Sequence, residues 1–275
     1  MRIYVTHETR YRYDEPVTRV IQALRVTPRP HQGQHIVNWR IEVSRDCKLD
    51  AYEDSFGNLM HAFSADGPLD EFRVLVAGEV ETQDTHGIVR GAVERFPPSL
   101  FLRETALTQP DHAILELARA LGASHAGDRL DLLHTLLRAL HDDVTYDTDP
   151  THPATTAAEA FSLRRGVCQD LAHIFIAAAR SLAIPSRYVS GYLYRNDGVT
   201  AQRAGHAWVE SFIPDLGWVA FDPTHKICAT DAYVRIAIGL DYLGAAPVRG
   251  ARAGGDGETL MVAVHIDQAQ RQSQS

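Results

Sequence analysis

The sequence predicts an α+β protein in which a helix that carries a cysteine packs on an antiparallel sheet, behind an all-β amino-terminal region. Three observations predict it. Short segments of alternating apolar and polar residues fill the first 95 residues or so. Apolar residues at helical spacing follow Cys168. Two alternating segments, 206–213 and 218–222, flank the turn-forming residues 214–217, which is typical of a β-hairpin.

The composition is that of an ordinary globular protein and disfavours two classes of partner. The 275 residues are enough for two domains with a full core, and 45% hydrophobic with 23% charged residues is a usual proportion. A formal net charge of −8 disfavours nucleic acid and anionic membranes as partners. Neither a signal peptide nor a membrane-spanning run is visible, and three widely spaced cysteines do not form a disulfide framework. We therefore expect a cytoplasmic protein, and its oligomeric state is not indicated.

Residues 1–95 are predicted to form a β-sandwich or an open barrel. Candidate strands alternate with turn-forming residues, and Pro16 is expected to end the first strand. The predicted strands are 1–13, 19–26, 36–44, 59–65 and 72–82. The histidines of this region are scattered, which predicts packing or surface roles rather than a metal site.

A connector at 96–110 leads to the predicted second domain at 111–266, and a polar tail occupies 267–275. Two prolines, Pro97 and Pro98, mark the connector as a break in regular structure. The order of segments therefore predicts a β-rich domain followed by a domain that begins with helices.

The helices of the second domain are predicted from their caps and apolar stripes. Asp111 is expected to cap a helix that runs to about Leu121, and a second helix is expected over 130–142. Thr155 or Thr156 then caps a short third helix, because Glu159 follows at the spacing of a capping box.

Cys168 lies in the first turn of the next predicted helix, on its buried side. It precedes an apolar stripe that consists of Leu171, Phe175, Ala178 and Leu182. A thiol at this position is close to the positive end of the helix dipole and to unpaired N–H groups, which favour the thiolate. The position suits a nucleophile, although a lone cysteine is also a common packing residue.

The hairpin supplies the partners that a nucleophile needs. If its strands pair symmetrically about Pro214, then His206 and Asp222 are cross-strand neighbours on one face of the sheet. A carboxylate orients an imidazole and stabilises its protonated form. A helix packed across this face would bring Cys168 to the other ring nitrogen, which suits covalent acyl transfer. The same groups could bind zinc, but no fourth ligand has a recognisable spacing, so no metal site is predicted.

Five ordered motifs resemble the transglutaminase-like superfamily, and more closely its bacterial proteins with a β-rich amino-terminal region. The motifs are Thr155–Glu159, Arg165–His173, Ile184–Tyr192, Gly205–Glu210 and Leu216–Thr224. Any one of them alone would be unspecific, but their shared order and spacing are specific. The resemblance extends over essentially the whole chain and is strongest from about 150 to 250.

The resemblance implies a papain-like site with Cys168 as nucleophile, His206 as base and acid, and Asp222 as the orienting residue. The thiolate would attack a carboxamide or peptide carbonyl, release an amine, and form a thioester that either an amine or water resolves. The substrate would be a protein, a peptide or a small amide, and no metal or organic cofactor is needed. His225 stands where the family leads us to expect asparagine, and we expect no effect on the triad.

Four further residues are candidates for binding substrate. The backbone N–H of Cys168 suits one half of an oxyanion hole, and Gln169 or a side chain near Tyr146 could provide the other half. Trp208 and Trp218 either line the substrate cleft or fill the core between helix and sheet.

The rival hypothesis is a protein-binding module that keeps the transglutaminase fold without catalysis. The complete set of Cys168, His206 and Asp222 argues against this hypothesis. Whether the acyl group passes to an amine or to water depends on the shape and dryness of the cleft, which the sequence does not indicate.

Overall fold

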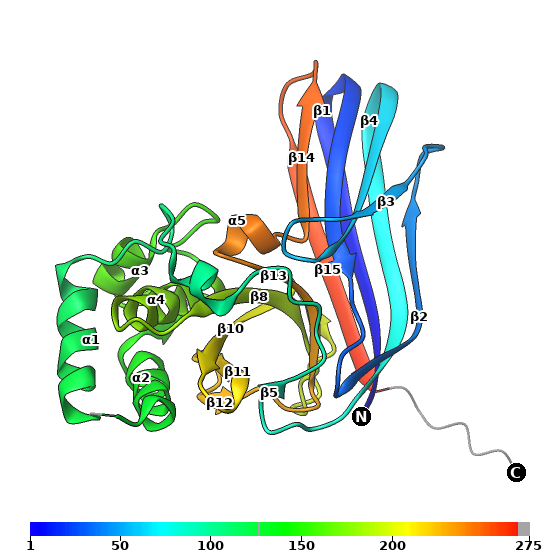
Figure 1. Cartoon of the computed structure of the whole chain (residues 1–275). Coiled ribbons are helices and arrows are strands. Elements are labelled where there is room, and N and C mark those ends of the chain that lie inside the picture. Colours follow the sequence, from blue (N-terminus) through cyan, green and yellow to red (C-terminus); the bar gives the residue numbers. More distant parts are fainter. Residues whose placement is uncertain (126, 269–275) are drawn as a thin grey trace, which may run out of the picture.

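The protein consists of a cluster of helices, a curved central sheet and a tall β-structure, arranged side by side (Figure 1). The structure is a computed structural model, and it describes residues 1–125 and 127–268. The predicted α+β architecture, with a β-rich amino-terminal region ahead of a helix-on-sheet core, is confirmed.

The tall part is built on a bent ribbon of two long strands, β1 (Arg2–Thr27) and β4 (Leu59–Thr82). Their regular pairing is interrupted between Arg12 and Arg19, and the ribbon folds back at its upper end in Figure 1. The two arms enclose an apolar core, in which Phe63 packs edge-on against Phe72 with 6.1 Å between ring centroids.

The expectation that Pro16 ends the first strand is therefore wrong. The predicted segments 1–13 and 19–26 are the two arms of β1, and 59–65 and 72–82 are the two arms of β4. Proline is tolerated here because it falls in the irregular stretch, where the ladder needs no donor from it.

Five shorter strands widen the two arms of the ribbon. They are β2 (Gln34–Val43), β3 (Asp50–Glu53), β9 (Ala201–Gln202), β14 (Val248–Ala253) and β15 (Thr259–Gln268). The last two pair with β1, so the structure places the end of the predicted second domain, 111–266, in the amino-terminal sheet. Alternation in the sequence indicates a strand but not which sheet it joins. Of the predicted polar tail at 267–275, residues 269–275 lie outside the described residues.

The central sheet has the strand order β12-β11-β10-β8-β13, with β5 paired to β11. Its members are β5 (Ile88–Val89), β8 (Ser186–Leu193), β10 (His206–Ile213), β11 (Gly217–Asp222), β12 (Ile227–Cys228) and β13 (Tyr233–Gly239). Every residue of β8 is buried, because helices cover one face and loops with the amino-terminal region cover the other. A short two-strand ladder, β6 (Thr145–Tyr146) with β7 (Arg165–Gly166), lies just before the cysteine helix.

Helices cover the face of the central sheet to which Val209 and Phe221 project, whereas His206 and Asp222 project from the other face, with Trp208. The helices are α1 (His112–Ser124), α2 (Arg129–Asp143), α3 (Ala157–Leu163), α4 (Cys168–Ser181) and the short α5 (Tyr242–Ala245), with a 3₁₀ turn at Pro98–Leu102. Asp111 caps α1 as predicted, since its side chain accepts from the N–H of Ile114. Thr156, rather than Thr155, makes the capping box of α3 with Glu159.

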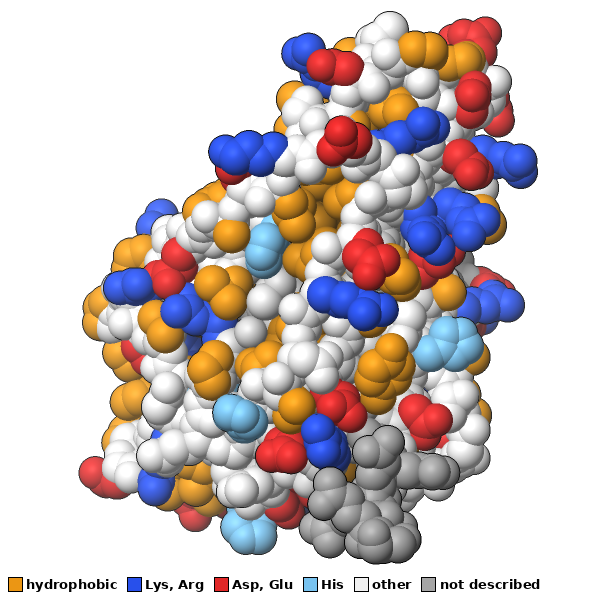
Figure 2. Space-filling model, turned by 90° about the vertical axis from the view of Figure 1, so that its right-hand side faces the viewer, with side chains coloured by type: hydrophobic (Ala, Val, Ile, Leu, Met, Phe, Trp, Pro, Cys, Tyr) orange, Lys and Arg blue, Asp and Glu red, His pale blue; other side chains and the backbone are white. Residues whose placement is uncertain are grey.

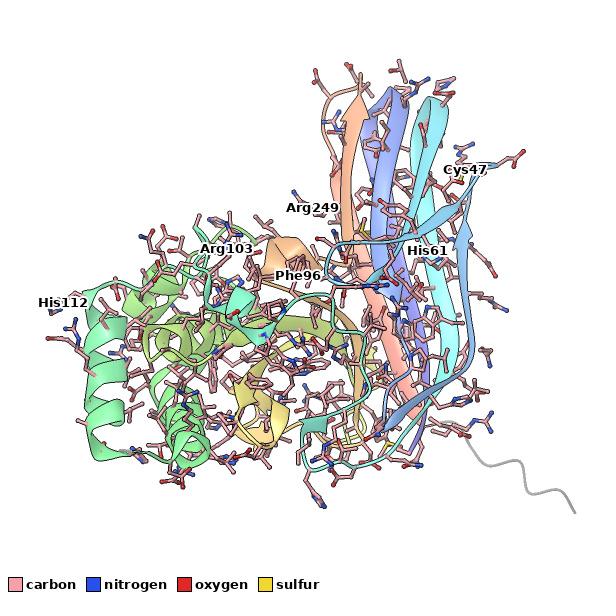
Figure 3. The ribbon with its side chains drawn as sticks, viewed as in Figure 1. Cys47, His61, Phe96, Arg103, His112 and Arg249 are labelled. Atoms are coloured by element: carbon pink, nitrogen blue, oxygen red, sulfur yellow. The ribbon has the colours of Figure 1, made fainter. Side chains whose placement is uncertain are left out.

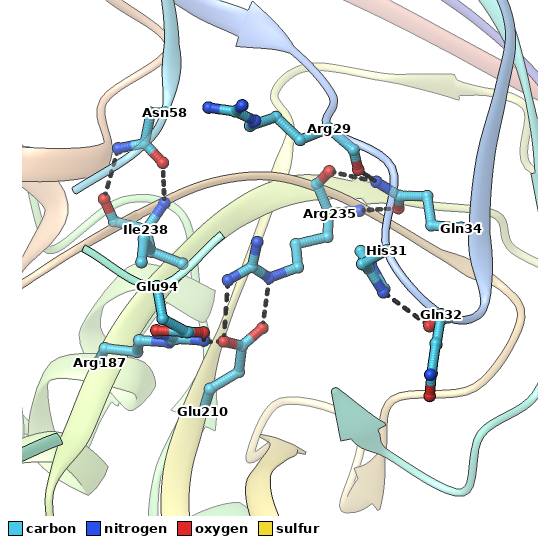
Figure 4. Close-up of polar contacts among 10 residues, drawn as sticks. All are labelled: Arg29, His31, Gln32, Gln34, Asn58, Glu94, Arg187, Glu210, Arg235 and Ile238. Carbon is cyan, nitrogen blue, oxygen red and sulfur yellow. Dashed lines mark hydrogen bonds and ion pairs between the residues drawn. The ribbon is translucent and has the colours of Figure 1, made fainter. Parts of the chain in front are cut away.

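Two side-chain amides from the amino-terminal region complete the edge of the central sheet (Figure 4). Gln34 donates to the carbonyl oxygen of Arg235 at 2.9 Å and accepts from its N–H at 2.8 Å. Asn58 does the same for Ile238, with both distances 2.8 Å. An edge strand exposes unpaired backbone groups, and these two amides pair with β13 as a further strand would. They join the amino-terminal region to the core.

A buried cluster of charges lies below this edge (Figure 4). Glu210, which is fully buried, accepts from Arg187 at 2.7 Å and from Arg235 at 2.6 Å. Although burial opposes ionisation, the two guanidinium groups lower the pKa of Glu210 to about 2. Glu94 binds Arg187 through both oxygens, at 2.7 and 2.9 Å. The cluster links three strands of the sheet to the segment that precedes the helices.

The described surface carries charges of both signs. Figure 2 shows acidic and basic side chains interspersed over one face, with hydrophobic side chains between them. Figure 3 shows His112 pointing outward from α1, and Cys47 at the side of the molecule opposite the helices. In the described part of the chain, none of the helices is both long enough and apolar enough to cross a membrane.

Replacing Asn58 by alanine should destabilise the fold. Asn58→Ala leaves the N–H and C=O of Ile238 without partners in a buried place, which should lower the free energy of unfolding by roughly 2 to 3 kcal/mol. Urea denaturation measures this loss. Asn38→Ala is the matched control, because Asn38 is exposed and makes one 3.3 Å contact with Glu79. Equal losses of unfolding free energy in the two variants would show that the contacts of Asn58 with β13 contribute little to stability.

His7 should make the protein sensitive to acid. It points from β1 toward the core, where Nδ1 lies 2.9 Å from the Tyr192 hydroxyl, and burial lowers its pKa to about 4. Between pH 6.5 and 4 the unfolded chain therefore binds a proton that the folded chain does not, so stability falls as the pH falls through this window.

His7→Gln should reduce the loss of unfolding free energy between pH 7 and pH 4.5 by about 2 kcal/mol. Urea denaturation at both pH values gives the comparison. His112→Gln, at a histidine whose side chain is 79% exposed, should leave the loss as it is in the wild type. The same loss in His7→Gln as in the wild type would exclude His7 as its source.

Candidate active site

Cys168 is the first residue of α4, and its position depends on a tightly packed turn. The N–H of Val167, just before the helix, donates to the Asp170 carboxylate at 2.8 Å, and the Thr151 hydroxyl donates to the same oxygen at 2.7 Å. Gly166 is needed beside this turn, because a Cβ there would lie 2.6 Å from that oxygen. The N–H of Cys168 itself has no acceptor within the helix and is therefore available to a ligand.

His206 and Asp222 come together across the hairpin of β10 and β11. Nε2 of His206 donates to Oδ2 of Asp222 at 2.7 Å, and both residues are buried. The register differs from the expected one by two residues, since Glu210 pairs with Ala220 rather than with Trp218. Asp215, not Pro214, is at the centre of the turn, with φ of 68°. A shift of two residues preserves the face, so the two side chains still meet.

Three donors converge on one oxygen of Asp222. Besides His206, Oδ2 accepts from the Tyr233 hydroxyl at 2.7 Å and from Nδ1 of His225 at 2.8 Å. The other oxygen accepts from the N–H of Thr224 at 2.9 Å. The expectation that His225 has no effect on the triad is thus wrong, because its ring binds the carboxylate directly. Sequence analysis missed Tyr233, which lies on another strand, and no local pattern indicates this contact.

The charges of the site favour a protonated His206. Burial alone would favour the neutral ring, but the charges of Asp222 and Cys168, and hydrogen bonds to both, raise the pKa of His206 to about 10. His206 and His225 in turn hold the pKa of Asp222 far below its usual range, against the effect of burial. Since Nε2 of His206 is committed to Asp222, Nδ1 is the nitrogen left for Cys168.

Cys168 and His206 line one cavity of about 310 Å³. One wall belongs to the core and includes Tyr188, Ser190 and Tyr192. The opposite wall belongs to the amino-terminal sheet and includes His7, Thr9, Tyr11, Leu260 and Val262. The cleft therefore lies between the two parts of the protein. The sequence indicated no site residue in the amino-terminal region, because this region comes close to Cys168 only in the tertiary structure.

The two candidate oxyanion donors differ in whether they line the cavity. Gln169 lines the cavity, and its side chain donates to the carbonyl oxygen of Pro153 at 3.2 Å. Tyr146 is 58% exposed and lies outside the cavity lining, although burial of its hydroxyl and the charge of nearby Cys168 raise its pKa. Of the two, only Gln169 reaches the space in which a carbonyl would bind.

Trp208 and Trp218 are core residues and do not line the cavity. Trp208 is 1% exposed and stacks against the His206 ring at a centroid distance of 6.1 Å. Trp218 lies under the guanidinium of Arg187, 3.8 Å from its carbon. Of the two alternatives for these tryptophans, the structure places both in the core, where Trp208 supports the imidazole.

Among the described residues, His206, Asp222 and His225 form a group whose nitrogen and oxygen atoms lie within 4.8 Å of one another. Such a group could hold a metal ion. However, Nε2 of His206 and Nδ1 of His225 each donate an N–H to the Asp222 carboxylate, so hydrogen bonding accounts for the arrangement.

Comparison with protein families assigns both parts of the chain. Residues 3–81 match the bacterial transglutaminase-like N-terminal region, and residues 116–223 match the transglutaminase-like superfamily. The chain belongs to the transglutaminase-like superfamily. The matched core includes Cys168, His206 and Asp222.

Relatives of this transglutaminase-like protein share either its length or its core. An uncharacterized protein of Mycobacterium leprae is 29% identical, over 96% of this chain and 98% of its own. A protein-glutamine gamma-glutamyltransferase of Pseudomonas aeruginosa is 32% identical over 40% of this chain, but only 18% of its own. The crystal structure of a candidate cysteine protease from Cytophaga hutchinsonii has a TM-score of 0.77, 20% identity, and covers 98% of this chain and 91% of its own. This last likeness confirms the fold.

Removing the charge of Asp222 should lower the pKa of His206. In Asp222→Asn the burial that opposes protonation remains while its main counter-charge is lost, so the ring should titrate well below pH 10. NMR titration of the imidazole measures this change. His225→Asn is the matched control, because an amide can still donate to the carboxylate and the charge of Asp222 remains. An unchanged His206 titration in Asp222→Asn would show that another group sets its pKa.

Proposed function

We propose that this protein is a cysteine-dependent enzyme of acyl transfer, acting on carboxamide or peptide bonds through a thioester. Cys168 is the nucleophile, His206 the proton carrier, and Asp222 the residue that orients the ring. The observation that carries the proposal is the buried 2.7 Å bond between His206 and Asp222, on the cavity that Cys168 also lines. The substrate is a protein, a peptide or a small amide.

The reaction has two halves. In the first, the thiolate sulfur of Cys168 bonds to the carbonyl carbon, the carbon–nitrogen bond breaks, and His206 gives its proton to the departing amine. In the second, water or an amine loses a proton to His206 and attacks the thioester, and the sulfur leaves as a thiolate. The free N–H of Cys168 suits the oxyanion that forms in both halves.

The electrostatics support this assignment of roles. Because the pKa of His206 is raised to about 10, its ring stays protonated at neutral pH and stabilises a thiolate beside it. The name of the Pseudomonas relative supports transfer from a glutamine carboxamide to an amine, and that of the Cytophaga structure supports hydrolysis. All three cysteines are free, which suits the reducing cytoplasm expected from the sequence.

Alkylation can test the nucleophile, and the other two cysteines act as internal controls. Burial raises the pKa of Cys228 to about 11 and also raises that of Cys47. At pH 6, iodoacetamide should therefore modify Cys168 at least about tenfold faster than either. Peptide mass mapping reads all three sites in one sample.

His206→Ala should remove this advantage of Cys168, since the imidazolium that stabilises the thiolate is lost. If Cys168 reacted at pH 6 as slowly as an ordinary thiol in both proteins, the protein would be better described as a binding module that keeps the fold. The mass of a glutamine peptide after incubation with an added amine then separates transamidation, which joins the amine to the side chain, from hydrolysis, which leaves a glutamate.

A further inference from the structure

The amino-terminal sheet contributes an ordered row of side chains to the cavity of Cys168. Tyr11 pairs with Leu260, and Thr9 pairs with Val262, across the ladder of β1 and β15. Directly paired residues of antiparallel strands project from the same face. These four side chains all line the cavity, so they form one continuous wall opposite the catalytic helix.

This wall and its surroundings offer little for a charged ligand to bind. Among the described residues that line the cavity, none is an aspartate or a glutamate. Arg25 is the lining residue with a permanent charge, and Asp54 already pairs with it at 2.9 Å. His7 is buried, with its ring nitrogens 2.9 Å from the Tyr192 hydroxyl and 3.2 Å from the Thr9 hydroxyl. The protonated His206 ring also lines the cavity, but it is bonded to Asp222 and stands beside Cys168. A charged group entering the cavity would therefore lose water without gaining a free counter-charge.

The size and shape of the cavity indicate what can enter it. Its volume of about 310 Å³ is at the lower end of the range of small-ligand pockets. Leu260 is 51% exposed and lines the cavity, so an apolar side chain stands partly in solvent at its rim. Burying such a surface against a ligand is favourable. The space suits a side chain with its neighbouring groups rather than a folded surface.

We propose that the acyl donor enters this cavity as an uncharged, apolar segment next to its carboxamide or peptide carbonyl. The wall of Tyr11, Leu260 and Val262 holds this segment while the carbonyl lies at Cys168. The amino-terminal region is therefore the part that selects the donor. This inference rests on the proposed function, because it takes Cys168 as the group that the donor must reach.

Alkylating reagents that share one reactive group can separate selection by the cavity from the reactivity of the Cys168 thiol. We would measure the alkylation rate of Cys168 in the full chain with iodoacetamide, its N-benzyl derivative, and N-substituted derivatives ending in a carboxylate or an ammonium. Each rate is divided by that of the same reagent with glutathione. The benzyl reagent should be favoured over iodoacetamide by about tenfold, and neither charged reagent should be favoured.

A pair of neighbouring variants tests the wall itself. Leu260→Asp should reduce the preference for the benzyl reagent to nearly none. Met261→Asp is the matched control, because Met261 is 47% exposed, follows directly on the same strand, and does not line the cavity. It should keep the full preference. Both sites are half-exposed, and thermal unfolding verifies that both variants fold.

The possible results separate the two proposals. Fast reaction of Cys168 with iodoacetamide but no preference for the benzyl reagent would overturn the selection of an apolar donor and leave the proposed function standing. A preference for a charged reagent would also overturn the selection of an apolar donor. So would an equal loss of the benzyl preference in Leu260→Asp and Met261→Asp. If no reagent reacted faster with Cys168 than with glutathione, the proposed function itself would fail, and this inference with it.

Discussion

The pairing of two side-chain amides with the edge of the central sheet determines the shape of the candidate site. Gln34 and Asn58 satisfy the backbone of β13 at Arg235 and Ile238, and thereby place the amino-terminal sheet against the core. Since the cavity of Cys168 has one wall in each part, a small displacement between the parts would change the space in which a substrate binds. A polar join of this kind is specific, because an imperfect fit leaves buried donors and acceptors without partners.

The Asp222 carboxylate organises the chemistry in a similar way. It accepts from groups on three segments, His206 on β10, Tyr233 on β13 and His225 after β11. A carboxylate with this many donors has little freedom to rotate, so the imidazole that it binds keeps one orientation. The stacked ring of Trp208 further restricts His206. The orientation of the His206 ring toward Cys168 therefore depends on residues that do not line the cavity.

Local patterns in the sequence predicted the elements of this protein better than their long-range partners. The helix of Cys168 and the meeting of His206 with Asp222 followed from spacing and from the parity of a hairpin, which a register shift of two residues preserves. The bend of β1 at Pro16 and the pairing of β15 with β1 were not predicted. The alternation of apolar and polar residues is the same in a bent or a straight strand, and in any sheet. The cavity wall at Tyr11 and Leu260 depends on that pairing and was therefore not predicted.

The place of β15 has a consequence for how the chain acquires its structure. This strand lies between β1 and β9, and it pairs Ile3 with Gln268, so the first sheet to leave the ribosome stays incomplete until nearly all of the chain has emerged. Contacts of such long sequence separation slow folding, and unpaired strand edges invite association with other chains. The cavity wall at Tyr11 and Leu260 would also be among the last parts to form. A nascent chain would thus have no complete cavity beside Cys168 until β15 has paired with β1.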